Sequence, residues 1–138
     1  LLLQELLQGH LKYDLMLIFL RLFSFYRRQP SLNHWTSYSF HKGIDLAAPQ
    51  GTPTYAAAAG TVMIAGYSSS AGNWVVISHG NGLVTKYMHH SALAVSAGQS
   101  VEKGQQIGYV GNTGNSFGAH LHFQVELNGA AVNPYNYL

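Results

Sequence analysis

Cysteine is absent from this sequence of 138 residues. Disulfides, cysteine-based zinc sites and cysteine nucleophiles are therefore excluded. Charge is also scarce, because only 9% of the residues are charged and the formal net charge is +2. The basic residues are scattered and form no stripe, so we do not expect nucleic acid as a partner.

Acidic residues are few, with five Asp and Glu against eight histidines. The sequence has no His-Glu-x-x-His motif, so it lacks the glutamate base of the common zinc proteases. It also has no Gly-x-Ser-x-Gly turn that would present a nucleophilic serine. If this protein activates water, we expect the base to be a histidine.

Long apolar runs are missing as well. The longest uncharged apolar run, residues 15–20, is far too short to cross a bilayer, so we expect no transmembrane span. Apolar residues in the first part of the chain recur at helical spacing, at Leu7, Leu11, Leu15, Ile18 and Leu22. We therefore predict an amphipathic helical segment or linker over residues 1–30, followed by the main domain over residues 31–138. Because the chain begins with leucine, we expect it to be a piece of a longer protein.

From residue 31 onward the sequence is typical of an all-β protein. Helical periodicity is lost, and short apolar runs alternate with glycine-containing turns. Gly80-Asn81-Gly82 separates two such runs and predicts a hairpin, and Asn128-Gly129 predicts another. Many short strands with frequent turns indicate an antiparallel sheet closed into a barrel or sandwich.

Two histidines lie on one face of a predicted strand. Side chains alternate along residues 118–125, so His120 and His122 project from one face and Leu121 and Phe123 from the other. The apolar face requires a core, which leaves the two imidazoles side by side on a rigid surface. This arrangement favours a metal or acid–base site. The alternative is a pair of solvated or core-bonded histidines.

A second polar pair, His41 and Asp45, shares one side of the alternating segment 40–46. In a straight strand their Cα atoms would lie about 13 Å apart, which is a long reach for one metal. Gly43 between them can supply a bend and leaves that face unobstructed. Two imidazoles and a carboxylate are the protein ligands of one kind of catalytic zinc site, whose fourth position is open to water. The alternation leaves open whether His120 or His122 would be the second imidazole.

The second strand of the predicted hairpin carries a further candidate. By alternation Thr85, Tyr87 and His89 share one face, and His90 points the other way. His89 falls at the strand end, where a side chain can point into a cleft. Its position is compatible with a structural role and with a catalytic role. We expect Tyr87 to pack within the hairpin and His79 to be a turn or surface residue.

Several separated motifs resemble, in the same order, those of the lysostaphin/LytM-type zinc metallopeptidases, the M23 peptidase family. They are Phe40-His41-x-Gly43-Ile44-Asp45, Tyr87-x-His89 and Gly114-x-Ser116-x-Gly118-x-His120-Leu121-His122-Phe123. The resemblance extends from about residue 40 to the end of the chain. It implies a two-layered antiparallel β fold, a duplicated hybrid motif, with a groove. Gln124 differs from the glutamate that is frequent in the family.

The resemblance also implies roles for five residues. His41, Asp45 and His122 match the zinc ligands, and His89 and His120 match the catalytic pair. The implied function is a zinc-dependent endopeptidase that hydrolyses peptide bonds in bacterial peptidoglycan stem peptides or cross-bridges. Its partner would be the peptidoglycan peptide, and its location would be outside the cytoplasm, in the periplasm, the cell wall, the medium or a phage virion.

The alternative is a non-catalytic module with the same fold that has a peptidoglycan-binding or regulatory role. Such a module is expected to lack a ligand or a catalytic histidine, whereas all five positions are filled in this sequence. The enzyme is therefore the favoured hypothesis.

Overall fold

The computed structural model describes residues 42–134, which form nine β-strands. The predicted helix over residues 1–30 and the candidate ligand His41 lie outside these residues. In the described part no helix is long and apolar enough to cross a membrane. The strands are β1 (Ile44–Ala47), β2 (Pro53–Tyr55), β3 (Gly60–Ser68), β4 (Gly72–Ser78), β5 (Leu83–Leu93), β6 (Ser100–Val101), β7 (Gln106–Val110), β8 (His120–Leu127) and β9 (Ala130–Val132).

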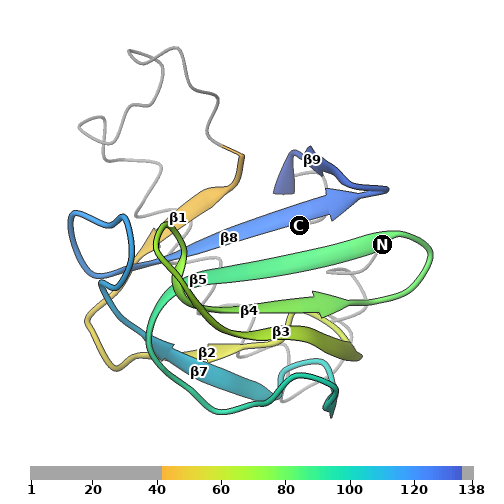
Figure 1. Cartoon of the computed structure of the whole chain (residues 1–138), viewed down its shortest axis with the longest axis horizontal. Coiled ribbons are helices and arrows are strands. Elements are labelled where there is room, and N and C mark those ends of the chain that lie inside the picture. The colour runs from red at the N-terminus through yellow and green to blue at the C-terminus, as the bar shows by residue number, and fades with distance from the viewer. Residues whose placement is uncertain (1–41, 135–138) are drawn as a thin grey trace.

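All strand pairs are antiparallel, and the main path of the sheet runs β1-β8-β5-β4-β3-β6 (Figure 1). β9 lies off this path and pairs with residues 125–127 of β8, while β7 pairs with β2 and with β5. The long strand β5 joins the two parts of the sheet. Residues 83–88 of β5 pair with β8, and residues 90–93 pair with β7. The predicted all-β antiparallel fold is confirmed for the described residues.

Both predicted hairpin turns are present. Gly80, Asn81 and Gly82 connect β4 to β5 with φ angles of 89°, 54° and 79°. Asn128 and Gly129 connect β8 to β9 with φ angles of 52° and 84°. These left-handed conformations are readily adopted by Gly and tolerated by Asn, which explains why these residues specify the turns.

The core lies behind the strand that carries the paired histidines. Leu121, Phe123 and Val125 alternate along β8 and are each at most 2% exposed. Phe123 packs on Tyr87 of β5, with ring centroids 5.4 Å apart. Because side chains alternate, burial of these residues directs His120 to the opposite face of β8. The core therefore fixes the orientation of the histidine-bearing face.

A polar chain also runs through this core. The buried Tyr87 hydroxyl accepts a hydrogen bond from Ala57 N at 2.9 Å and shares one with the Thr85 hydroxyl at 2.8 Å. Thr85 in turn contacts His79 Nε2 at 2.7 Å, and His79 Nδ1 donates to Ala59 O at 2.8 Å. Burial raises the pKa of Tyr87 to about 12 and lowers the pKa of His79. Tyr87 is packed as expected, whereas His79 links the 57–59 loop to the core instead of lying free at the surface.

Candidate functional site

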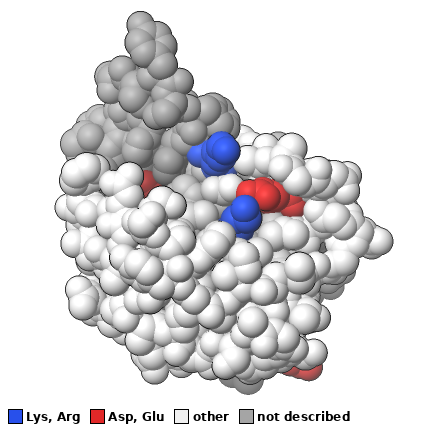
Figure 2. Space-filling model, viewed as in Figure 1, with Lys and Arg blue, Asp and Glu red and all other residues white. Residues whose placement is uncertain are grey.

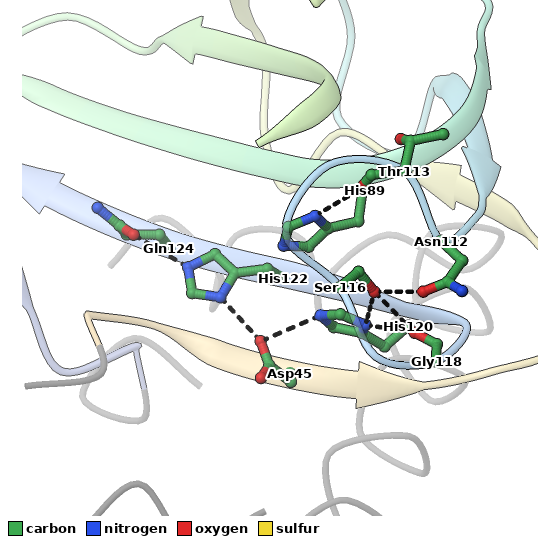
Figure 3. A network of polar contacts seen from close by, with 9 residues as sticks. All are labelled: Asp45, His89, Asn112, Thr113, Ser116, Gly118, His120, His122 and Gln124. Atoms are coloured by element: carbon green, nitrogen blue, oxygen red, sulfur yellow. Dashed lines mark hydrogen bonds and ion pairs between the residues drawn. The ribbon is translucent and has the colours of Figure 1, made fainter. Parts of the chain in front are cut away.

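Asp45 and His122 meet across the β1–β8 pairing, although 77 positions separate them in the sequence. His122 Nδ1 lies 2.8 Å from Asp45 Oδ1, and His120 Nε2 lies 3.7 Å from the same oxygen (Figure 3). Asp45 and His122 are each 8% exposed. The structure thus brings together two of the three predicted ligands, while the third, His41, lies outside the described residues.

A β-bulge redirects His89 toward this pair. Val75 pairs with Tyr87 and Asn73 pairs with His90, so β5 has one residue more than β4 in this interval. His89 has a φ of 70°, and the bulge reverses the alternation of side chains. Its ring lies 4.7 Å from the ring of His120, centroid to centroid. The expectation that His89 shares a face with Tyr87 is therefore wrong, because that expectation assumed a regular strand.

Hydrogen bonds hold the bulge in place. The Thr113 hydroxyl donates to His90 O at 2.6 Å and accepts from Asn73 N at 3.1 Å. His89 N donates to Ala71 O at 2.8 Å. A residue other than glycine at positive φ costs about 1–2 kcal/mol. These contacts offset that cost, and they keep His90 fully buried on the other side.

The loop between β7 and β8, residues 111–119, contacts both histidines of the predicted catalytic pair. His89 Nδ1 lies 2.8 Å from Thr113 O, and His120 Nδ1 lies 2.7 Å from Gly118 O. The Ser116 hydroxyl is also 3.1 Å from His120 Nδ1. Because a carbonyl oxygen only accepts, both imidazoles carry a proton on Nδ1 and, when neutral, a lone pair on Nε2.

The surroundings of His89 favour its neutral form. Burial lowers the pKa of His89, and the neighbouring His120 and His122 lower it further. The hydrogen bond to Thr113 O and the charge of Asp45 act in the opposite direction but do not outweigh burial. His89 therefore has a free Nε2 lone pair near neutral pH.

The model of one protein family, Peptidase family M23, matches residues 39–134 of the sequence. The chain belongs to this family. The resemblance that the sequence motifs indicated is confirmed by this match. The matched residues include every residue of the candidate site.

Among M23-related proteins, the chain is 47% identical over 109 residues to the DD-carboxypeptidase/endopeptidase Mpg of Neisseria meningitidis, covering 79% of the chain and 24% of that protein. It is 46% identical over 93 residues to the peptidoglycan DD-endopeptidase ShyA of Vibrio cholerae, covering 67% of the chain and 22% of that protein. The chain thus spans about a quarter of the length of these relatives. Its structure is similar to that of a zinc-containing peptidase from Vibrio cholerae, with a TM-score of 0.67, 36% identity, and coverage of 75% of this chain and 33% of the other.

The donors at the M23 site fit a divalent metal. His122 Nε2 lies 3.0 Å from Gln124 Oε1, and His122 Nδ1 lies 2.8 Å from Asp45 Oδ1. Both oxygens only accept, so a neutral imidazole donates to one of them and directs a lone pair at the other. When the proton is on Nε2, the Nδ1 lone pair and Asp45 Oδ1 repel each other unless a cation lies beside them. Imidazole nitrogen and carboxylate oxygen are both zinc ligands. Within residues 42–134 no group of three such side chains forms a complete metal site.

Gly43 lies at a bend of the chain, as the sequence suggested, and it also leaves room for the site. A Cβ at this position would lie 2.5 Å from Phe123 O and 2.7 Å from His122 Nε2. Its φ is not among the positive angles, so its conformational freedom is not what matters. The missing side chain lets the chain pass close to the imidazole of His122.

Sequence reasoning missed three residues that support the site, namely Asn73, Thr113 and Gln124. Gln124 had a detectable signal, because it lies two positions after His122 on the same face of β8. Thr113 and Asn73 had none, since their role depends on the position of the 111–119 loop beside the bulge.

Proposed function

We propose that this chain is the catalytic domain of a zinc-dependent endopeptidase that hydrolyses peptide bonds in peptidoglycan stem peptides or cross-bridges. The observation that carries the proposal is the convergence of Asp45, His122, His89 and His120, from three strands, at one partly exposed site. Two relatives named as DD-endopeptidases support the reaction and the substrate class.

The residues that would hold zinc are His41, Asp45 and His122. His41 lies four positions before Asp45 in the sequence, and the other two already face each other. When bound, zinc supplies Lewis acidity toward a carbonyl oxygen and lowers the pKa of a water molecule. The zinc-containing structural relative supports this choice of metal.

His89 and His120 would move the proton. One Nε2 lone pair takes a proton from the attacking water, and the other accepts the second hydrogen of that water and orients it. The imidazolium formed in this way stabilises the negative charge that develops on the substrate carbonyl oxygen. It then returns its proton to the amine that leaves.

The substrate sets the location that we propose. Peptidoglycan lies outside the cytoplasm, so the domain would act in the periplasm, in the cell wall, after secretion or within a phage virion.

The test is release of soluble fragments from purified peptidoglycan, with and without a chelator, combined with measurement of zinc content. We expect His120→Ala to keep zinc and lose turnover, and His122→Ala to lose both. His10→Ala, in the predicted N-terminal segment, serves as a histidine-to-alanine control and should behave as the unchanged chain.

Wild-type rates in His120→Ala, or full zinc occupancy in His122→Ala, would contradict the assigned roles. Wall binding by the zinc-loaded chain without cleavage of any tested peptidoglycan would instead support the non-catalytic module.

A further inference from the structure

A line of polar side chains extends from His122 across the outer face of the sheet. Gln124 Oε1 lies 3.0 Å from His122 Nε2, and Gln124 Nε2 lies 2.6 Å from Glu126 Oε2. Lys86 of β5, directly opposite Gln124 in the register, places Nζ 2.8 Å from the same Glu126 oxygen. Figure 2 shows lysine and acidic side chains side by side on one face of the molecule.

The chemistry of these groups fixes the orientation of the Gln124 amide. The Lys86 ammonium only donates and the Glu126 carboxylate only accepts, so the amide nitrogen of Gln124 must face Glu126. The amide oxygen is then directed at His122. Because this oxygen only accepts, it favours the tautomer of His122 whose proton is on Nε2.

Burial makes this orientation costly to reverse. Gln124 is 5% exposed, and the side chains of Lys86 and Glu126 are 24% and 16% exposed. A flipped amide would bring its oxygen against the carboxylate of Glu126 and its nitrogen against the Nε2–H of His122. A buried polar group left without a partner costs about 1–3 kcal/mol, so the observed orientation is strongly favoured.

Asp45 competes for the same proton. Its Oδ1 lies 2.8 Å from His122 Nδ1 and would accept a hydrogen bond if the proton moved to that nitrogen. A protonated Nδ1 has no lone pair and cannot bind a metal. Whether Nδ1 is available therefore depends on the balance between Asp45 and the partners on the Nε2 side.

We infer that Gln124 and Glu126 are positioning residues that hold the proton of His122 on Nε2 and so keep a lone pair on Nδ1 for the metal. The inference rests on the proposed role of His122 as a ligand. Lys86 contributes by neutralising Glu126, whose carboxylate orients the amide.

Three variants test this role. Gln124→Leu removes the acceptor, so we expect the proton to move to Nδ1 and zinc affinity to fall 10–100-fold, as for other residues that orient metal ligands. Glu126→Gln lets the amide take either orientation, and we expect a smaller loss in the same direction. The double variant Gln124→Glu with Glu126→Gln reverses the order of carboxylate and amide. Its Glu accepts directly from His122, so we expect affinity to be restored.

Two readouts are needed. Two-bond ¹H–¹⁵N correlation spectra of the metal-free protein identify the protonated nitrogen of His122. Competition with a chelator gives the zinc affinity without any activity measurement. Gln105→Leu is the matched control, because that amide accepts from Glu102 N in an exposed turn. It should change neither readout.

The inference would be overturned if His122 of the wild-type protein carried its proton on Nδ1. It would also be overturned if the zinc affinity of Gln124→Leu lay within about twofold of the wild-type affinity. If Gln124→Leu does not fold, the double variant provides the test. A zinc affinity of the double variant no higher than that of Glu126→Gln alone would also overturn the inference. A wild-type chain that binds no zinc would remove the proposed function. The spectra would then still show whether Gln124 sets the tautomer of His122.

Discussion

His89 and His120 come from different strands, yet both donate their Nδ1 proton to the same loop. Their ring centroids lie 4.7 Å apart, and the acceptors are Thr113 O at 2.8 Å and Gly118 O at 2.7 Å. Since a neutral imidazole that donates from Nδ1 has its lone pair on Nε2, residues 111–119 prepare two proton acceptors at once. The conformation of this loop therefore affects the chemistry of the site as well as access to it.

Thr113→Val should lower kcat with little change in KM. The variant loses the hydroxyl that binds His90 O and Asn73 N, so the bulge that presents His89 loosens. Misplacement of a catalytic group by about 1 Å can cost on the order of 10²-fold in rate. Steady-state kinetics on a soluble peptidoglycan fragment would measure the effect.

Thr113→Ser should recover most of the activity, because it keeps the hydroxyl. Thr52→Val is the control, since the Thr52 hydroxyl also donates to a carbonyl, Pro49 O at 2.7 Å, but at an exposed turn. Equal losses in Thr113→Val and Thr52→Val would show that the Thr113 hydroxyl has no special role.

His89→Gly should be more stable than His89→Ala, by about 1 kcal/mol, because glycine adopts the φ of 70° without steric cost. Both variants should be inactive. Urea unfolding would give the free energies. Tyr67 is an exposed residue of β3 whose φ is not positive, and it serves as the control. There the alanine variant should be more stable than the glycine variant. A less stable glycine variant at position 89 would argue against strain in the native bulge.

Gly43→Ala should weaken zinc binding and lower the free energy of unfolding by about 1–3 kcal/mol, as overpacking commonly does. The added methyl group would lie 2.7 Å from His122 Nε2 and 2.5 Å from Phe123 O, so the imidazole must move. Gly66→Ala is the control, because a Cβ there meets nothing within 4 Å. Chelator competition and urea unfolding measure the two effects. Unchanged zinc affinity in Gly43→Ala would show that the ring tolerates the shift.

Stability should fall between about pH 6.5 and pH 4 through protonation of His90 in the unfolded chain. Burial lowers the pKa of His90 to about 4, whereas the unfolded chain takes up this proton near pH 6.5. The stability that depends on neutral His90 is thus fully present above pH 6.5 and lost as the pH falls to about 4. The difference in pKa corresponds to about 3 kcal/mol.

His90→Gln should flatten this dependence. A glutamine stays neutral at every pH in the range, and it retains hydrogen-bonding groups for Thr54, which contacts His90 Nε2 at 2.9 Å. Urea unfolding of both proteins from about pH 4 to pH 8 gives the difference in slope. Parallel curves would mean that other histidines account for the acid sensitivity.

Much of the fold could be predicted from local residue patterns. Gly80-Asn81-Gly82 and Asn128-Gly129 specify turns through backbone conformation, which is a property of the residues themselves. The alternation around His120 and His122 identifies which face of β8 packs in the apolar core and which face carries the histidines. Such signals need no knowledge of distant parts of the chain.

The rest depends on contacts between distant segments. His89 reaches the site through one extra residue relative to β4, and no feature of the segment 83–93 marks where that bulge occurs. The acceptors at Thr113 and Gly118 are backbone carbonyls, which every residue has. Gly43 is needed because of the His122 ring, which lies far away in the sequence but next to it in space.

The pairing of β1 with β8 also bears on the order in which the protein folds. Within the described residues, β1 is the first strand and pairs with β8 alone. It therefore finds its partner only after nearly all the other described strands have been made. Contacts of such long sequence separation form slowly, because a long loop must close first. A nascent chain that ends before residue 120 holds Asp45 but neither His120 nor His122. Synthesis of the domain therefore yields a competent site only near its completion.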